Sequence, residues 1–365
     1  MCCVSPLVAA PESKRMSEGS IAVHRVDPLK DARWDEFVRR HPHSSVFHSS
    51  AWLRALQRSY LYEPFVLTAS APGEDLDNGI AFCRIESFVT GRRAISLPFS
   101  DHCEPLVSAQ EMLEPLLNSV TAYFRSENLR YIEMRPLTSP QSMACFRGFR
   151  QFWWHTVDLR RDPADIFRAL HKDCVQRKIR RAERESLLEE SGRSEHLLAK
   201  FYDLLVLTRR RHGLVPQPIT WFRHLIGCFG DALTIRVVSK GGRPVAAILT
   251  LRHKSVIVYK YGCSDPSCYQ LGGVQYLLWR TIQDAHHQGI RELDLGRTDY
   301  DDSGLAQFKD RWGSTRSTLT YWRTSTQGGA ATSRSSIVRT ARVLLPHMPD
   351  TVLTALGRIL YRHIG

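Results

Sequence analysis

The same order of expected elements occurs twice along this chain, and this internal repeat limits its fold more than any other feature. The first half has strands expected at 64–68, 79–88 and 94–97, then a loop, a helix at 110–126, and strands at 131–134 and 152–159. The second half has strands expected at 233–239, 245–251 and 255–261, a helix that carries residues 274–285, a strand at 292–295, a short helix at 304–312 and a strand at 318–323. Mixed strand and helix patterns predict an α/β fold. We expect two related α/β domains, at 22–158 and 159–326.

A helical insertion is expected between the two repeats, over residues 163–188 and 195–212. Pro163 suits a first helical turn, and Gly213 suits a C-terminal cap. Four arginines lie at i, i+3, i+4 and i+7 in the first helix, which places them on one stripe: Arg177, Arg180, Arg181 and Arg184. Such a stripe is either a solvated face or a binding strip for phosphate groups. Arg211, at the end of the second helix, favours the phosphate-binding interpretation.

Charge and cysteine content bear on partners and compartment. Lysine and arginine outnumber acidic residues by 50 to 37, which gives a net charge of +13. This excess favours partners that carry phosphate or present a membrane surface. None of the nine cysteines forms a CxxC pair, and no cluster has zinc-site spacing, so we expect no metal and reduced thiols in the cytoplasm. No apolar stretch is long enough to span a bilayer, and no secretory signal is evident.

Several short segments, in this order, resemble the FemAB-like transferases, the peptidoglycan interpeptide-bridge enzymes of the GNAT acyltransferase superfamily. The resemblance covers residues 30–325, and its segments include His48-Ser-Ser-Ala-Trp52, Ser96-Leu-Pro-Phe99, Tyr259-Lys-Tyr-Gly-Cys-Ser-Asp265, Asp294-Leu-Gly-Arg297 and Gly304-Leu-Ala-Gln-Phe-Lys-Asp-Arg-Trp-Gly313. It implies two tandem GNAT-like domains. It also implies transfer of an acyl or aminoacyl group to an amine of a cell-envelope or exopolysaccharide precursor.

The resemblance further implies a catalytic lysine before the closing strand, which here is Lys309. A fixed cation stabilises the negative charge that develops on the carbonyl and leaving oxygens when an amine attacks an activated ester. In the first-half loop, Asp101 is a candidate for holding the attacking amine. The loop lacks the glycine-rich segment common in cell-wall members, and the two inserted helices are too short for a tRNA-binding coiled-coil arm.

The co-substrate is therefore either an aminoacyl-tRNA or an acyl-CoA, with no further cofactor. Gly272 and Gly273 precede the second-half helix where GNAT enzymes bind the CoA pyrophosphate, but their spacing departs from the usual motif, and close strand–helix packing explains them equally well. Tyr259 and Tyr261 are expected on one face of their strand, as a ligand-flanking pair or as core. Arg297 ends a strand, and contacts either a phosphate or Asp294 or Asp299.

Both ends of the chain differ in composition from the middle. Residues 1–21 read as a disordered polar tail in which Met16 is an alternative start. Residues 327–365 read as a linker followed by two short basic amphipathic helices. Such helices either cap the second domain or lie in a membrane interface. In the second case residues 335–365 would contact the inner face of the cytoplasmic membrane.

A non-catalytic module that binds RNA or another anion is the alternative to an enzyme.

Overall fold

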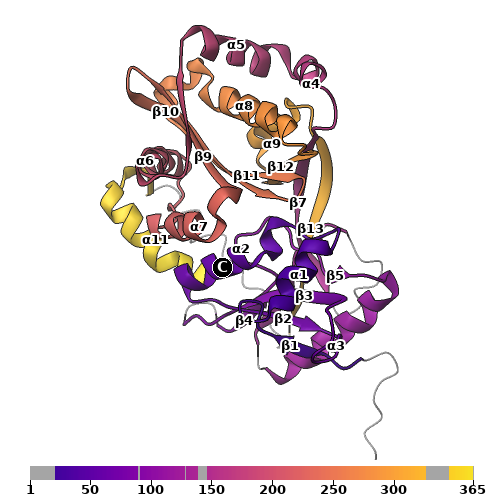
Figure 1. Ribbon diagram of the computed structural model, residues 1–365. Helices are drawn as coiled ribbons and strands as arrows, with labels where there is room; N and C mark the ends of the chain where they lie inside the picture. The colour runs from indigo at the N-terminus through magenta and orange to yellow at the C-terminus, as the bar shows by residue number, and fades with distance from the viewer. Residues whose placement is uncertain (1–20, 89–90, 128, 139–145, 326–344, 365) are drawn as a thin grey trace, which may run out of the picture.

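The computed structural model describes residues 21–88, 91–127, 129–138, 146–325 and 345–364 (Figure 1). The tail expected at 1–21 lies almost wholly outside these residues, as does the first of the two tail helices. The repeated element order is confirmed in both halves, so the α/β class is confirmed as well.

The first half follows the expected order, with two helices ahead of its main strands. Ser49 caps α2 by accepting a hydrogen bond from the backbone N–H of Trp52. The elements are β1 (His24–Val26), α1 (Ala32–Arg40), α2 (Ser50–Tyr60), β2 (Glu63–Thr68), β3 (Asn78–Ile85), β4 (Arg93–Ile95), β5 (Leu106–Val107), α3 (Leu113–Ser126), β6 (Tyr131–Met134) and β7 (Arg147–Asp158).

The second half begins with the inserted helices and ends on a long strand. Its helix α7 was not expected from the sequence. The elements are α4 (Pro163–Ala169), α5 (Arg177–Arg184), β8 (Leu188–Gly192), α6 (Glu195–Arg211), α7 (Ile219–Phe229), β9 (Leu233–Lys240), β10 (Arg243–His253), β11 (Val256–Ser264), α8 (Gly273–His287), β12 (Glu292–Asp299), α9 (Ser303–Asp310) and β13 (Thr315–Ser325), followed by α11 (Asp350–Ile364) near the C-terminus.

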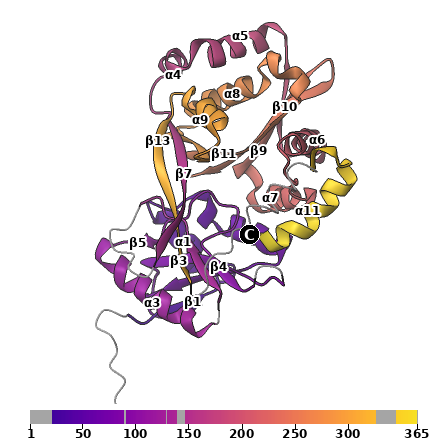
Figure 2. The same cartoon turned by 180° about the vertical axis from the view of Figure 1, so that it is seen from behind.

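One continuous sheet joins the two halves because their closing strands are exchanged. The order through the junction is β6-β13-β7-β12, so the last strand of the second half lies between two strands of the first. Strand β13 pairs with β6 through Trp322 and Met134 and with β7 through Leu319 and Phe152, while β7 also pairs with β12. The long β7 and β13 cross the centre of the molecule in Figures 1 and 2.

Helices cover both faces of this sheet. On one face, a single core cluster runs across both halves and includes Trp34 and Trp52 from α1 and α2, and Phe201 and Trp221 from α6 and α7. On the other face, α3 covers the first half, and α4, α5 and α8 cover the second. The halves are therefore joined by shared strands and by a shared core.

The single helix expected at 163–188 is wrong. Helix α4 ends where Leu170 adopts an extended conformation, and the backbone N–H of the next residue, His171, donates to the carbonyl of Arg311. A π-helical turn then leads into α5, and Ser186 in the left-handed region ends that helix before β8. Docking against the end of α9 and pairing of β8 with β9 override the helical periodicity.

The described tail helix, α11, packs against both halves. Leu353 is buried, and the carbonyl of Tyr361 accepts a hydrogen bond from the Tyr62 hydroxyl of the first half. The Tyr361 hydroxyl donates to the carbonyl of Val215 in the second half. A Cβ on Gly357 would lie 2.2 Å from the carbonyl oxygen of Pro216, so this position of α11 tolerates only glycine. The helix caps the junction rather than the second half alone.

Candidate active site

The loop after β4 carries Asp101 and is held in a strained conformation. Leu97 and Phe99 both have positive φ angles, of 61° and 59°, which are costly for residues with a Cβ. The buried Arg135 guanidinium donates to the carbonyls of Leu97 (3.0 Å) and Ser100 (3.1 Å). Strain of this kind persists only where the surroundings impose it, and here Arg135 supplies that restraint.

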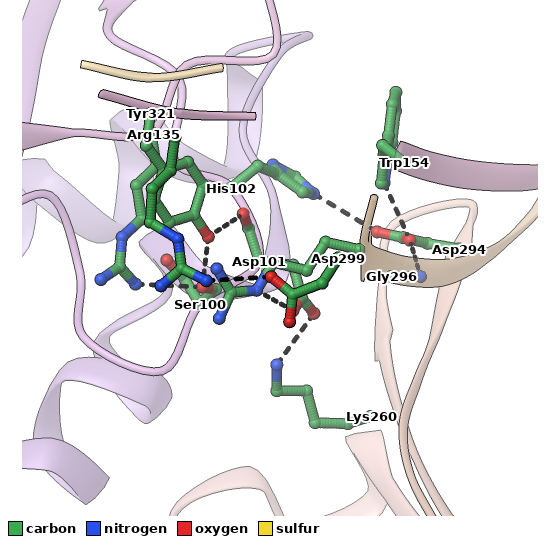
Figure 3. A network of polar contacts seen from close by, with 12 residues as sticks. Ser100, Asp101, His102, Arg135, Trp154, Lys260, Asp294, Gly296, Asp299 and Tyr321 are labelled. Atoms are coloured by element: carbon green, nitrogen blue, oxygen red, sulfur yellow. Dashed lines mark hydrogen bonds and ion pairs between the residues drawn. The ribbon is translucent and has the colours of Figure 1, made fainter. Parts of the chain in front are cut away.

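Asp101 reaches from this loop to the second half. Its carboxylate accepts a hydrogen bond from Lys260 Nζ (2.9 Å) and lies 3.8 Å from Arg297 Nε, while its carbonyl accepts one from the Tyr321 hydroxyl (2.7 Å). Figure 3 shows Asp101 between Lys260 and Tyr321. Burial would raise the pKa of Asp101, but the charges of Lys260 and Arg297 outweigh it and lower the pKa. Asp101 is therefore an ionised anchor for cations.

Lys309 lies in the same region, in the last turn of α9. Asp302 caps this helix by accepting a hydrogen bond from the backbone N–H of Leu305 (3.0 Å). The Lys309 side chain is only 3% exposed, and its Nζ donates to the carbonyls of Gly296 (2.9 Å) and Arg297 (2.8 Å). Burial lowers the pKa of Lys309 to about 8, against the charges of Asp101 and Asp294. An ammonium has three N–H groups, and the third has no partner among the described residues.

Arg297 pairs with Asp101 and not with Asp294 or Asp299, the two internal partners expected from the sequence. Its guanidinium lies over the rings of Phe152 (4.3 Å) and Tyr321 (5.1 Å) and beside Asp101. Asp299 instead pairs with Arg150 at 3.0 Å. The structure thus brings three of the predicted site residues together: Asp101, Arg297 and Lys309.

Tyr259 and Tyr261 do not share a face as expected. The register between β10 and β11 shifts at this point, because Leu249 pairs with Tyr261 while the next residue, Thr250, pairs with Tyr259. This bulge inverts the alternation. Tyr261 belongs to the core cluster shared by both halves, where its hydroxyl accepts from Trp221 Nε1 (2.9 Å), and Tyr259 packs against the cluster on the other face. The bulge leaves Lys260 free to reach Asp101.

Close packing requires glycine at residue 272, just before α8, and at residue 273, the first residue of α8. Gly272 has a φ of 75°, and a Cβ there would lie 2.5 Å from the carbonyl oxygen of Lys178 in α5. A Cβ on Gly273 would lie 2.8 Å from that of Ala246 in β10. Close strand–helix and helix–helix contact therefore explains both positions. Nearby, Arg211 lies over the ring of Tyr269 at 4.9 Å, in the turn that precedes Gly272.

The arginine stripe is separate from this cluster. All four arginines lie on α5, three of them exposed and Arg181 half-buried, at the end of the second half that points away from the first half in Figures 1 and 2. Arg177 pairs with Asp173 (3.5 Å), Arg181 with Glu185 (3.6 Å), and Arg180 lies over Phe167. The structure records no contact between them and the Asp101 cluster in the part of the chain that it describes.

Sequence reasoning did not select several residues that complete the cluster. Lys260 lies in the segment from Tyr259 to Asp265 that resembles the family. Its contact with Asp101 depends on the bulge in β11, which the sequence does not reveal. Arg135 directly follows β6 and Tyr321 lies within β13, so they belong to different halves, and no local pattern links them to the loop. A cavity of about 380 Å³ lies elsewhere, between β9–β11 and α8, and its lining includes Arg236, Thr250 and Asp284.

No metal site is evident among the described residues, where no group of three or more His, Cys, Asp or Glu side chains has suitable geometry. No helix in the described ranges combines the length and apolar character needed to cross a bilayer. The cysteines that the structure describes are all free thiols.

The fold of this chain is similar to that of known proteins. Residues 157–310 match the family model of the acetyltransferase (GNAT) domain. Among solved structures, FemX superposes with a TM-score of 0.64 at 15% identity, over 79% of this chain and 94% of that one. No match was found among curated protein sequences.

Two further solved structures span most of the chain. The C-terminal domain of a protein described as lysylphosphatidylglycerol synthetase, from Agrobacterium fabrum, gives a TM-score of 0.53 at 15% identity, over 89% of this chain and 96% of that one. A tandem GNAT protein from the clavulanic acid biosynthesis pathway gives 0.55 at 9% identity, over 85% and 100%. The chain therefore has the fold of tandem GNAT proteins, and its residues 157–310 match the family model of the acetyltransferase (GNAT) domain.

Proposed function

We propose that this protein is an N-acyl or aminoacyl transferase that acts on an amine of a cell-envelope or exopolysaccharide precursor. The observation that carries the proposal is the environment of Lys309: a buried cation with two N–H groups fixed by backbone carbonyls and a third N–H without a partner among the described residues. It lies where the two halves meet, close to the charges of Asp101 and Arg297.

This arrangement suits amide formation from an activated acyl group. The amine nitrogen attacks the carbonyl carbon, its lone pair forms the new C–N bond, and the carbonyl electrons move onto oxygen. The intermediate then collapses, the bond to the leaving oxygen or sulfur breaks, and the proton lost by the amine goes to the leaving group. The third N–H of Lys309 is available to stabilise the oxyanion or the leaving atom, and a low-dielectric site strengthens that interaction.

A pKa of about 8 also suits proton transfer near neutral pH. Charged Lys309 can donate its third N–H to the leaving atom. The neutral amine that remains keeps both hydrogen bonds to the carbonyls and takes up the proton lost by the attacking amine, which restores the charged form. In this proposal Asp101 does not act as a base, because its carboxylate is held by Lys260 and Arg297. It orients these cations towards an anionic donor or acceptor.

The donor is either an aminoacyl-tRNA or an acyl-CoA. One similar structure is described as a lysylphosphatidylglycerol synthetase domain and another as a tandem GNAT protein without AcCoA, and neither description decides between the two donors for this chain. The arginine stripe and Arg211 are the surfaces that we assign to phosphate groups of a tRNA, nucleotide-sugar or lipid diphosphate. The non-catalytic anion- or RNA-binding module is the second candidate, favoured by the cationic stripe alone.

We further propose that the protein works in the cytoplasm and contacts the inner face of the membrane through 335–365. In the described part of this segment, Val352 and Ile359 on the outer side of α11 are 44% and 62% exposed, and Arg358 and Arg362 beside them are exposed too. Apolar side chains flanked by arginines suit the interface of a bilayer with anionic lipids.

A transfer assay with purified protein and Lys309→Ala tests the enzymatic proposal. Charged tRNA and acyl-CoA are offered separately with an envelope-precursor extract, and products are identified by mass. We expect product from one donor and a loss of about 100- to 1000-fold in Lys309→Ala, the usual effect of removing an oxyanion donor. Tight binding of either donor with no product, unchanged in the variant, would instead support the binding module.

A further inference from the structure

Asp294 is a buried carboxylate in β12 that takes no direct part in the proposed reaction. Its Oδ1 accepts hydrogen bonds from Trp154 Nε1 (3.0 Å) and from the backbone N–H of Gly296 (2.6 Å). Its Oδ2 lies 3.3 Å from Nε2 of His102, the residue after Asp101. Figure 3 shows these three contacts around one carboxylate, which joins β7, β12 and the first-half loop.

Strand β12 is irregular at this carboxylate. Its register with β7 shifts between Asp294 and Gly296, and Gly296 has a φ of 72°. A side chain there would also crowd the first-half loop, since a Cβ on Gly296 would lie 3.2 Å from Asp101 Oδ2. The two carbonyls that hold Lys309 Nζ, those of Gly296 and Arg297, come from this kink. The conformation that places Lys309 therefore depends on how the kink is held.

We propose that Asp294 is a positioning residue, which fixes the β12 kink that holds Lys309 and, through His102, ties this kink to the loop that carries Asp101. The inference deepens the proposed function and rests on it for its catalytic consequence. The positioning of Lys309 by Asp294 can be tested without the reaction, because one buried carboxylate sets the geometry and the charge around a single lysine. A glycine in the left-handed region whose N–H is capped from two residues upstream is a stable local kink.

The charge of Asp294 provides a readout that mere folding would not change. Asp101 and Asp294 favour the charged form of Lys309, whereas burial, Lys260 and Arg297 oppose it. Removing the charge of Asp294 must therefore lower the pKa of Lys309 further. The other titratable or charged groups around this end of α9 are His155 of β7, Asp310 of α9 and Arg316 of β13.

The direct test is an NMR titration of lysines labelled with ¹³C at Cε, in the full-length protein. The chain has only nine lysines, and loss of one signal in Lys309→Arg assigns Lys309. We expect Asp294→Asn to lower the pKa of Lys309, since the amide oxygen still accepts both Oδ1 hydrogen bonds while the charge is gone. Asp299→Asn is the matched control, because Asp299 lies on the same strand and pairs with Arg150 at the surface. An unchanged Lys309 pKa in Asp294→Asn, or an equal shift in the control, would overturn the inference.

Gly296→Ala tests the kink with Asp294 intact and serves also if Asp294→Asn does not fold. The added Cβ strains the left-handed conformation, so we expect the Lys309 signal to move. We also expect kcat to fall by about 100-fold with KM little changed, the effect of a misplaced catalytic group. An unmoved Lys309 signal would overturn the role of the kink. A shifted Lys309 pKa in Asp294→Asn without any transfer by the wild-type protein would leave the positioning role standing and overturn the proposed function.

Discussion

The arginines of α5 and the cations around Asp101 carry the same formal charge in opposite environments. On α5 the side chains lie on the surface, with few and weak partners. Around Asp101, the side chains of Lys260 and Lys309 are almost fully buried. Lys260 binds the Asp101 carboxylate of the other half, and Lys309 donates to two backbone carbonyls of β12. Exposed cations attract phosphate at long range and cost little to remove, whereas buried cations are fixed in place and their removal leaves a charge unpaired. The difference in burial underlies our proposal that the stripe binds phosphate groups and that the buried cluster is the reaction site.

The largest difference is expected in stability. Lys260→Met removes the cation that is hydrogen-bonded to the buried Asp101 carboxylate and leaves Arg297 Nε at 3.8 Å and Lys309 nearby, so we expect a loss of about 3–5 kcal/mol in the free energy of unfolding. The matched variant on the stripe, Arg177→Met, removes an exposed pair and is expected to change it by less than about 0.5 kcal/mol. Urea denaturation measures both. Equal losses would show that burial does not distinguish the two regions.

The pH dependence of transfer also distinguishes the two regions, because buried Lys309 titrates at about pH 8 whereas the arginines of α5 do not. The charged form of Lys309 is lost as the pH rises through about 8, so kcat/KM should fall above that pH, about tenfold per unit where charged lysine is required. In Lys309→Arg this alkaline limb should disappear, because a guanidinium does not titrate in this range. Rates measured from pH 6 to 10 on a donor that is stable there test this. A limb that persists in Lys309→Arg must belong to another group.

The stripe should act on affinity alone. Replacing Arg177, Arg180, Arg181 and Arg184 by alanine should reduce the slope of log K against log salt for a single-stranded RNA by about 3, if each contacts one phosphate. Turnover at saturating substrate should be unchanged. Titrations at several salt concentrations give the slope, and Arg39→Ala, on the distant α1, is the control. A fall in kcat would place the stripe in the reaction site after all.

The smallest effect concerns the outer face of α11. A single arginine near an anionic membrane contributes about 1 kcal/mol, so Arg358→Ala should weaken binding to vesicles that contain phosphatidylglycerol by about fivefold. Neutral phosphatidylcholine vesicles should bind weakly and show no difference between variant and wild type. Co-sedimentation measures both. Binding that is insensitive to lipid charge would contradict the membrane contact.

The repeat of elements, and hence the fold, was predictable from local patterns of apolar residues and turns. Of the residues that the structure brings together around Asp101, the sequence predicted Lys309, Asp101 and Arg297, the first of these only through the family resemblance. It did not identify Lys260, because a bulge in β11 reverses the expected alternation, nor the break after α4, because contact with α9 imposes it. It also did not reveal that β7 and β13 are exchanged, since strand order depends on contacts far apart in sequence.

That exchange has a consequence for how the protein folds and for how it can be divided. A fragment that ends at residue 158 would leave β6 without its neighbour β13 and would carry β7 with no partner strand. A fragment that begins at residue 159 would leave the edge of β12 open and β13 unpaired. Neither piece is a self-sufficient folding unit, so the halves should melt in one cooperative transition. The two halves share one order of elements, and because their last strands are exchanged we expect each half to need the other in order to fold.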